Sequence, residues 1–92
     1  MATDKKVDTH KIAVTTTPTY ADFDGPPLSE VYLHADDANV HVDFDTSPDV
    51  STSFLIPKDV VVRIRVNCNK VYALTSTGTA NLYVMGVRLN SA

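Results

Sequence analysis

The chain lacks tryptophan and has only one cysteine, three glycines and one glutamate among its 92 residues. A single cysteine excludes an internal disulfide, so the chain is no disulfide-stapled secreted miniprotein and suits a reducing site of synthesis. It also lacks an apolar run long enough for a signal peptide or a membrane span. We therefore expect a protein that is made in the cytoplasm and has no membrane partner.

The charge balance is mildly acidic, with 11 acidic against 8 basic residues and a formal net charge of −3. Free-standing nucleic-acid binders usually present a basic face, so we expect no nucleic acid as a partner. The length allows one domain, and a chain of this size buries only about two-thirds of its unfolded surface. Contacts with partner proteins can therefore add to its stability.

Apolar residues recur with period two, and no helical periodicity of useful length is present. The clearest case is 60–66, which places Val60, Val62, Ile64 and Val66 on one face and Val61, Arg63 and Arg65 on the other. Similar patterns predict strands at 11–17, 30–35, 40–45, 51–56, 70–76 and 80–89. Short strands at close spacing predict an all-β fold, a small antiparallel β-sandwich or barrel of about seven strands.

Polar turn residues separate these strands. The segment 36–39 predicts a turn that joins strands 30–35 and 40–45 as an antiparallel hairpin. We also expect hairpin turns at 67–70 and at 76–79, with Gly78 in the left-handed conformation. The sequence Asp24-Gly25-Pro26-Pro27 predicts a loop that Tyr20 and Phe23 anchor in the core.

The first ten residues are polar, with Val7 as their one internal apolar residue. They bury too little to offset their ordering entropy, so we predict a flexible N-terminal arm over 1–10 and a single β domain over 11–92. The arm is either a frayed terminus or a segment that orders on a neighbouring subunit. Strands 70–76 and 80–89 are apolar on both faces, which indicates central strands or contact with another subunit, and we expect a homo-oligomer.

Patterns of catalytic chemistry are weak. The three glycines form no phosphate loop, and no Gly-x-Ser-x-Gly motif is present. Cys68 lies between two asparagines with only Lys70 as a neighbouring base, which predicts an unreactive thiol, exposed or half-buried. We expect no catalytic residue, no cofactor and no enzyme.

Two sets of residues hint at metal binding but fall short of a site. His34 and His41 flank the 36–39 turn and could meet across the expected hairpin, yet a closed site needs more ligands. Asp43, Asp45 and Asp49 resemble part of a calcium loop, with Asp36 and Asp37 nearby, but the turning glycine and terminal glutamate are missing. We expect surface histidines, turn-forming aspartates and no metal.

Tyrosines and arginines supply the candidate contact residues. Tyr20, Tyr32, Tyr72 and Tyr83 could form an aromatic platform, or Tyr72 and Tyr83 could cover the sheet as cross-strand neighbours. Arginine is enriched at interfaces; Arg63 and Arg65 point the same way, with Arg88 expected beside them. The full set of interface candidates is Lys5, Lys6, Val7, Arg63, Arg65, Tyr72, Tyr83 and Arg88.

About half of the chain resembles a known group of proteins. The segments 54–59, 60–66, 70–74 and 77–84 run as an "Ile-Pro" turn into a strand, a "Val-Tyr-Ala-Leu" strand, a Gly-Thr-Ala turn and a closing strand. This pattern resembles small structural proteins of tailed bacteriophages, including capsid decoration (cement) proteins.

The resemblance implies a non-enzymatic virion protein, made in the host cytoplasm, that binds and stabilises the assembled shell. Its partner would be the major capsid protein or another virion protein. The alternative is a carbohydrate- or receptor-binding module of a phage tail or fibre. That module would use Tyr32, Tyr72 or Tyr83, with calcium held by Asp36, Asp37 and Asp43.

Overall fold

The computed structural model describes residues 7–23, 25–46 and 53–88. These residues form eight antiparallel strands and no helix. The strands are β1 (Val7–Val14), β2 (Thr19–Asp22), β3 (Leu28–Asp36), β4 (Val40–Phe44), β5 (Phe54–Ile56), β6 (Val61–Cys68), β7 (Lys70–Leu74) and β8 (Ala80–Val87). Because no helix is present in these ranges, none of sufficient length and hydropathy crosses a membrane.

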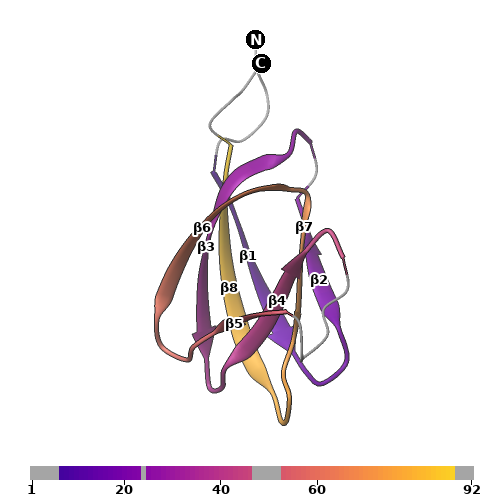
Figure 1. Cartoon of the computed structure of the whole chain (residues 1–92), viewed down its shortest axis with the longest axis vertical. Helices are drawn as coiled ribbons and strands as arrows, with labels where there is room; N and C mark the ends of the chain where they lie inside the picture. The colour runs from indigo at the N-terminus through magenta and orange to yellow at the C-terminus, as the bar shows by residue number, and fades with distance from the viewer. Residues whose placement is uncertain (1–6, 24, 47–52, 89–92) are drawn as a thin grey trace.

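The strands form two four-stranded sheets that pack face to face (Figure 1). Sheet I has the order β1-β8-β3-β6, and sheet II has the order β2-β7-β4-β5. Only the β4–β5 connection stays within one sheet, whereas every other connection crosses to the opposite sheet. This strand order is that of a jelly roll, a double Greek key found in viral capsid and lectin domains. The expected all-β sandwich is therefore confirmed, with eight strands in place of about seven.

The core lies between the sheets, where the inward residues alternate with outward ones along each strand. Sheet I contributes Val31, Leu33, Ala35, Leu82 and Val84, and sheet II contributes Val40, Val42, Ile56, Val71 and Ala73, all nearly or fully buried. Ile12 and Val14 point inward as expected. On β6 the expected inward face is confirmed for Val62, Ile64 and Val66, which pack against the core, whereas Val60 precedes the strand and is exposed.

Two small residues mark close packing and a tight turn. A Cβ at Gly86 would lie 2.6 Å from Leu28 Cδ1, so the absence of a side chain lets β8 pass the buried leucine. Gly78 has φ +72°, which confirms the expected left-handed glycine between β7 and β8.

The expected hairpins are wrong. β3 belongs to sheet I and β4 to sheet II, so 36–39 carries the chain across the sandwich and does not pair its flanking strands. The same holds for 67–70 and 76–79, because β6 and β8 lie in sheet I and β7 in sheet II. The turn chemistry is present at 36–39, where Asp37 has φ 78°, but turn chemistry does not decide which sheet receives the next strand.

The expected boundary of the N-terminal arm also needs correction. Val7 to His10 belong to β1 and pair with β8 from Val87 to Val84. His10 packs edge-on against the buried Phe23, with ring centroids 4.5 Å apart. The remainder of the expected arm, residues 1–6, lies outside the described residues.

The segment just before the expected loop at 24–27 forms a strand that the sequence did not reveal. β2 pairs with β7 through Thr19, Tyr20, Ala21 and Asp22. Phe23 is fully buried and anchors the chain as expected, but Tyr20 is half-exposed and is no core anchor.

Candidate docking face

The outer surface of sheet I is the strongest candidate for a functional site. Strand register aligns its outward residues in rows. A short row, Ala13-Asn81-Asp36, runs across β1, β8 and β3, and three rows of four residues run across β1, β8, β3 and β6. We call these twelve residues the docking face. The rows are Val7-Val87-Glu30-Arg65, Thr9-Met85-Tyr32-Arg63 and Lys11-Tyr83-His34-Val61.

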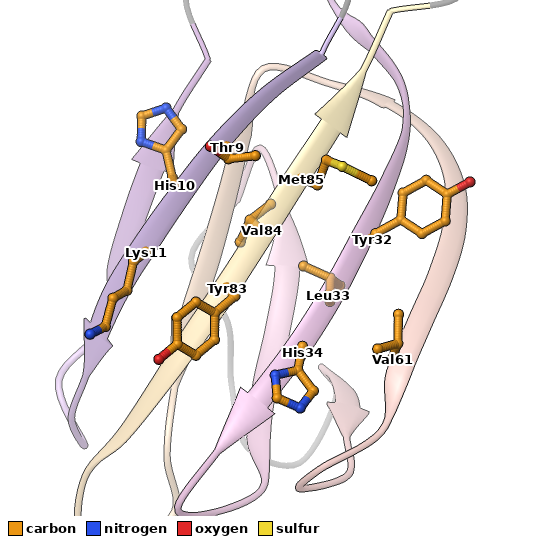
Figure 2. Close-up of a pocket in the computed structure, with 10 residues that line it drawn as sticks. All are labelled: Thr9, His10, Lys11, Tyr32, Leu33, His34, Val61, Tyr83, Val84 and Met85. Atoms are coloured by element: carbon orange, nitrogen blue, oxygen red, sulfur yellow. The ribbon is translucent and has the colours of Figure 1, made fainter.

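Tyr83 lies at the centre of the third row. The Lys11 ammonium is 5.5 Å from the centroid of its ring, within range of a cation–π contact. The His34 ring lies on its other side, with centroids 5.9 Å apart and planes tilted by 35°. Figure 2 shows the three side chains side by side on β1, β8 and β3. The Tyr83 ring therefore packs between Lys11 and His34, while the residue remains 38% exposed.

A shallow hollow of about 360 Å³ opens on this face. Met85, Tyr32, Val61 and Tyr83 line it with apolar surface, and Lys11 and His34 stand at its margin (Figure 2). Val61 is 67% exposed, an unusual state for a valine in a strand. The hollow can take an apolar side chain of a partner, and the Lys11 ammonium beside it favours a negative group.

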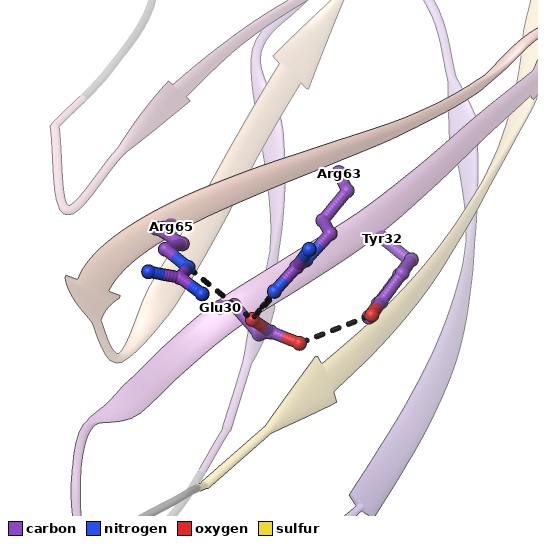
Figure 3. A network of polar contacts seen from close by, with 4 residues as sticks. All are labelled: Glu30, Tyr32, Arg63 and Arg65. Atoms are coloured by element: carbon purple, nitrogen blue, oxygen red, sulfur yellow. Dashed lines mark hydrogen bonds and ion pairs between the residues drawn. The ribbon is translucent and has the colours of Figure 1, made fainter.

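A polar network covers the end of the face where β3 begins and β8 ends (Figure 3). Arg63 donates from Nη2 to Glu30 Oε1 at 2.9 Å, and the Tyr32 hydroxyl donates to Glu30 Oε2 at 3.1 Å. Arg65 Nε lies 4.0 Å from Glu30 Oε1. The hydrogen bond from Arg63 lowers the pKa of Glu30, against the opposing effect of desolvation, and Glu30 in turn raises the pKa of Arg63.

The network leaves positive charge at the surface. The Glu30 side chain is only 7% exposed, whereas those of Arg63 and Arg65 are 49% and 78% exposed. With Lys11, the docking face has three cations and one carboxylate, a formal charge of 3 − 1 = +2, in a chain of net charge −3. Asp36 lies in the row beside the face, so the whole outer surface of sheet I has a formal charge of 3 − 2 = +1, still positive in a chain that is acidic overall.

Four of the expected interface candidates meet on this face: Val7, Arg63, Arg65 and Tyr83. Lys5 and Lys6 lie outside the described residues. Sequence reasoning missed Lys11, Met85 and Val61 as contact residues. Their outward position follows from strand alternation, but their proximity depends on the pairing of β8 with β1 and β3, which no local signal encodes.

Tyr72 lies on the opposite side of the molecule, on the outer surface of sheet II. Its ring is 5.0 Å from that of Tyr20, and the Lys70 ammonium is 5.1 Å from the Tyr20 ring. The interpretation of Tyr72 and Tyr83 as cross-strand neighbours is therefore wrong, and so is that of one platform built from all four tyrosines. Tyr20 and Tyr72 form a pair on sheet II, whereas Tyr32 and Tyr83 lie on the outer surface of sheet I.

Arg88 does not join Arg63 and Arg65. It is only 3% exposed, and its Nε donates to the Pro26 carbonyl at 2.7 Å. This bond ties the end of β8 to the loop before β3. Arg88 thus has a structural position, and the expectation of an arginine surface that includes it is wrong.

The histidines and aspartates are spread over both sheets. His34 is on the outer surface of sheet I and His41 is on β4 of sheet II, so the expected meeting of the two is wrong. Asp45 Oδ1 accepts from the backbone N–H groups of Asn69 and Lys70 at 2.9 and 2.8 Å, which fixes the start of β7. Asp49 lies outside the described residues. Within 7–23, 25–46 and 53–88, no three His, Cys, Asp or Glu side chains are placed to hold a metal ion.

Cys68 is buried at the end of β6, not exposed or half-buried as expected. Burial, together with the negative charge of Asp45, raises the pKa of the thiol to about 11. The thiol is therefore protonated at neutral pH, and the thiolate that would act as nucleophile or metal ligand is scarce.

The chain matches no family model, and no curated protein or solved structure is significantly similar to it.

Proposed function

We propose that this protein is a non-enzymatic virion structural protein, a decoration or cement protein that binds the assembled capsid shell through the docking face. The observation that carries the proposal is the composition of that face. It combines two tyrosines, a methionine and two arginines, residue types enriched at protein–protein interfaces, with an exposed valine at the β6 edge.

The charge of the docking face favours an acidic partner surface. Lys11 lies at the β1 edge and Arg63 and Arg65 lie at the β6 edge, so cations flank an apolar centre. A partner segment with apolar side chains in the middle and carboxylates on both flanks would complement this arrangement. Complementary charges would steer and orient the subunit, while Tyr83, Met85 and Val61 would supply the buried apolar area.

The strand order supports the proposal by analogy. Jelly rolls occur in viral capsid proteins and also in lectins, and a fold alone does not assign a function. The resemblance of 54–84 to small phage virion proteins favours the first of these two uses. A subunit that binds only the assembled shell stabilises that state by its binding free energy, and many copies multiply a modest contact.

Co-sedimentation with shells tests the proposal. Purified shells from the virus that encodes the chain should carry the protein at a fixed ratio to the shell subunit. Tyr83→Ala should weaken binding by roughly 10–100-fold, as expected for a central aromatic contact. Tyr20→Ala removes a half-exposed tyrosine from sheet II and is the matched control, with binding changed by less than about twofold.

Two outcomes would refute the proposal in this form. A wild-type protein that stays in the supernatant at all concentrations does not bind shells. Equal binding by Tyr83→Ala and Tyr20→Ala would show that the contact lies elsewhere on the molecule.

The hollow beside Tyr83 supports one alternative, a carbohydrate- or receptor-binding module. Its volume of about 360 Å³ is within the range of small-ligand sites, and Lys11 and His34 at the margin suit an acidic sugar. A glycan array with wild-type protein and Lys11→Ala tests this alternative. Binding that depends on Lys11, in a protein that ignores shells, would favour it.

A further inference from the structure

β6 ends sheet I, and its outer edge is open (Figure 1). Among the described residues it pairs with β3 alone, so alternate residues along β6 direct their backbone N–H and C=O groups away from the sheet. The strand has eight residues without proline or glycine, and it pairs with β3 in regular register over 61–65. An edge of this length and regularity is a template for one more strand.

The inward side of β6 is only half-buried. Val62, Ile64 and Val66 pack against the core but keep part of their surface exposed. The inward residues of the neighbouring strand β3, such as Val31 and Leu33, are fully buried. β5, the last strand of sheet II, is joined to β6 by residues 57–60 and has only three residues, so it offers the longer β6 little cover. A strand added beside β6 would bury this remaining apolar surface, which favours its binding.

The outward side of β6 presents positive charge at the edge. In the register with β3, Arg65 lies opposite Glu30 and Arg63 lies opposite Tyr32. Glu30 is one carboxylate between two guanidinium groups: Arg63 donates to it at 2.9 Å, whereas Arg65 Nε lies 4.0 Å away. The Arg65 side chain is 78% exposed, so most of its donor capacity is open to solvent. An acidic residue on a strand beside β6 can lie directly opposite Arg65 and pair with it.

The same two arginines disfavour a second copy of β6 as the added strand. Antiparallel pairing of two β6 strands over most of their length, with their outer surfaces on one side, sets Arg63 opposite Arg65 or sets Arg65 opposite its own copy. Like charges directly opposite one another destabilise a strand pair, whereas opposite charges stabilise it. The edge therefore discriminates against its own copy and in favour of an acidic strand.

We propose that the β6 edge binds an extended acidic segment of a partner protein, which adds a fifth strand to sheet I. The backbone of the segment pairs with β6, and its side chains alternate between the two faces. Acidic residues two positions apart lie opposite Arg63 and Arg65 and extend two rows of the docking face. Apolar residues between them face inward and cover Val62, Ile64 and Val66. The edge thus selects a strand in which acidic and apolar residues alternate.

Peptide binding to the purified protein tests this inference without any shell. The probe is a fluorescent peptide of about eight residues, the length of β6, in which glutamate and valine alternate. Fluorescence anisotropy should show saturable binding. A matched peptide with glutamine in place of each glutamate keeps the alternation and loses the charges, so its binding should be weaker by roughly tenfold or more.

A charge exchange tests the contact with Arg65. Arg65→Glu should weaken binding of the glutamate peptide by roughly tenfold or more, and it should bind instead a peptide in which lysine replaces glutamate. Lys70→Glu makes the same change of charge beside Tyr20 on sheet II and is the control, with binding changed by less than about twofold. Circular dichroism of both variants checks that they are folded.

Amide hydrogen exchange of the wild-type protein locates the bound strand. The alternate amides of β6 that point away from β3 should become protected when the glutamate peptide binds. A peptide bound elsewhere would leave these amides unprotected and would overturn the inference. So would equal binding of the glutamate and glutamine peptides, no binding of either, or protection of the same amides by self-association without peptide. Sedimentation with shells is measured separately, so this inference and the proposed function can fail independently.

Discussion

At the scale of single residues, Glu30 is a charged residue on the outer side of sheet I that neighbouring side chains cover almost completely. Its carboxylate accepts hydrogen bonds from Arg63 and Tyr32, and these side chains cover it. A partner that approaches the docking face meets the two arginines first. The carboxylate thus orients Arg63 while the face keeps its positive charge.

Removing this carboxylate should weaken the fold in a pH-dependent way. The pKa of Glu30 is lowered by Arg63 from 4.5, so the folded state favours the ionised form. Between the lowered pKa and 4.5 the unfolded chain binds more protons, and stability therefore rises with pH through this window. The contribution is complete above about pH 4.5 and is lost as the pH falls through the folded-state pKa.

Glu30→Gln should therefore melt below wild type at pH 7, and the difference should shrink as the pH falls below about 4.5. Thermal unfolding followed by circular dichroism from pH 7 to pH 3 measures both curves. Asp22→Asn removes an exposed carboxylate and is the control, with a smaller effect at pH 7. A difference that grows towards acid pH would contradict the interpretation.

Cys68 should make the fold sensitive to alkali. Its folded-state pKa is about 11 against 9.0 for the free thiol, so the unfolded chain loses the proton first and stability falls from about pH 9 to about pH 11. The loss is on the order of 3 kcal/mol for a shift of this size. Chemical denaturation of wild type and Cys68→Ala at each pH isolates this loss. The other titrating groups are the same in both proteins, so their effects cancel when the two free energies of unfolding are subtracted. Parallel curves for the two proteins would show that the thiol is not the cause.

At the scale of strands, alternation predicted most elements and their inward faces. Val62, Ile64 and Val66 on β6, and Val40 and Val42 on β4, point to the core because period two assigns faces whatever the partner strand is. β2 was not predicted from the sequence, because it is only four residues long and lies between Pro18 and a glycine–proline loop. The burial of Cys68 was not predicted either, since the residue lies in a segment that was expected to be an exposed turn.

The same local sequence rules could not predict which sheet each connection leads to. Polar segments such as 36–39 and 67–70 look like hairpin turns, yet they carry the chain from one sheet to the other. A crossing needs a reversal of direction just as a hairpin does, so both use residues that tolerate left-handed backbone. For this reason Arg63 and Tyr83 were identifiable as surface residues, while their meeting with Lys11 on one face was not.

The alternation on β6 supports a paired test at this scale. Val62→Asp should lower the free energy of unfolding by about 2–4 kcal/mol, because it replaces apolar contact with a carboxylate that faces the core. Asn67→Asp adds the same charge to the exposed side of the same strand and should change it by less than about 0.5 kcal/mol. Urea denaturation measures the free energy of unfolding of both variants. Equal effects would show that the inward and outward faces of β6 are assigned wrongly.

At the scale of the whole molecule, the jelly roll separates two surfaces with different properties. The docking face lies on the outer surface of sheet I and carries the exposed arginines, whereas the outer surface of sheet II carries the Tyr20–Tyr72 pair. If the proposed shell binding holds, many copies that each bind through sheet I would leave sheet II facing outward from the shell.

The topology also predicts how the protein folds. β1 pairs with β8, from Val7 with Val87 to Val14 with Ala80, so the two ends of the chain must meet before sheet I is complete. Closing long loops ahead of their contacts slows folding, and all-β proteins of this kind fold in milliseconds to seconds. β1 begins and β8 ends at the same end of the sandwich (Figure 1), so the chain can be rejoined there.

A circular permutant that joins residue 92 to residue 1 and opens the chain within 76–79 turns β8 and β1 into a local pair. The opened turn is exposed, and no atom lies within 4 Å of a Cβ at Gly78, so the cut should leave the core intact. Stopped-flow circular dichroism should show refolding several-fold faster than wild type, because the β1–β8 contact no longer needs closure of the whole chain. Unfolding rates should change less. A permutant that refolds no faster would mean that the rate-limiting step lies in sheet II, where β2 still has to find β7 across most of the sequence.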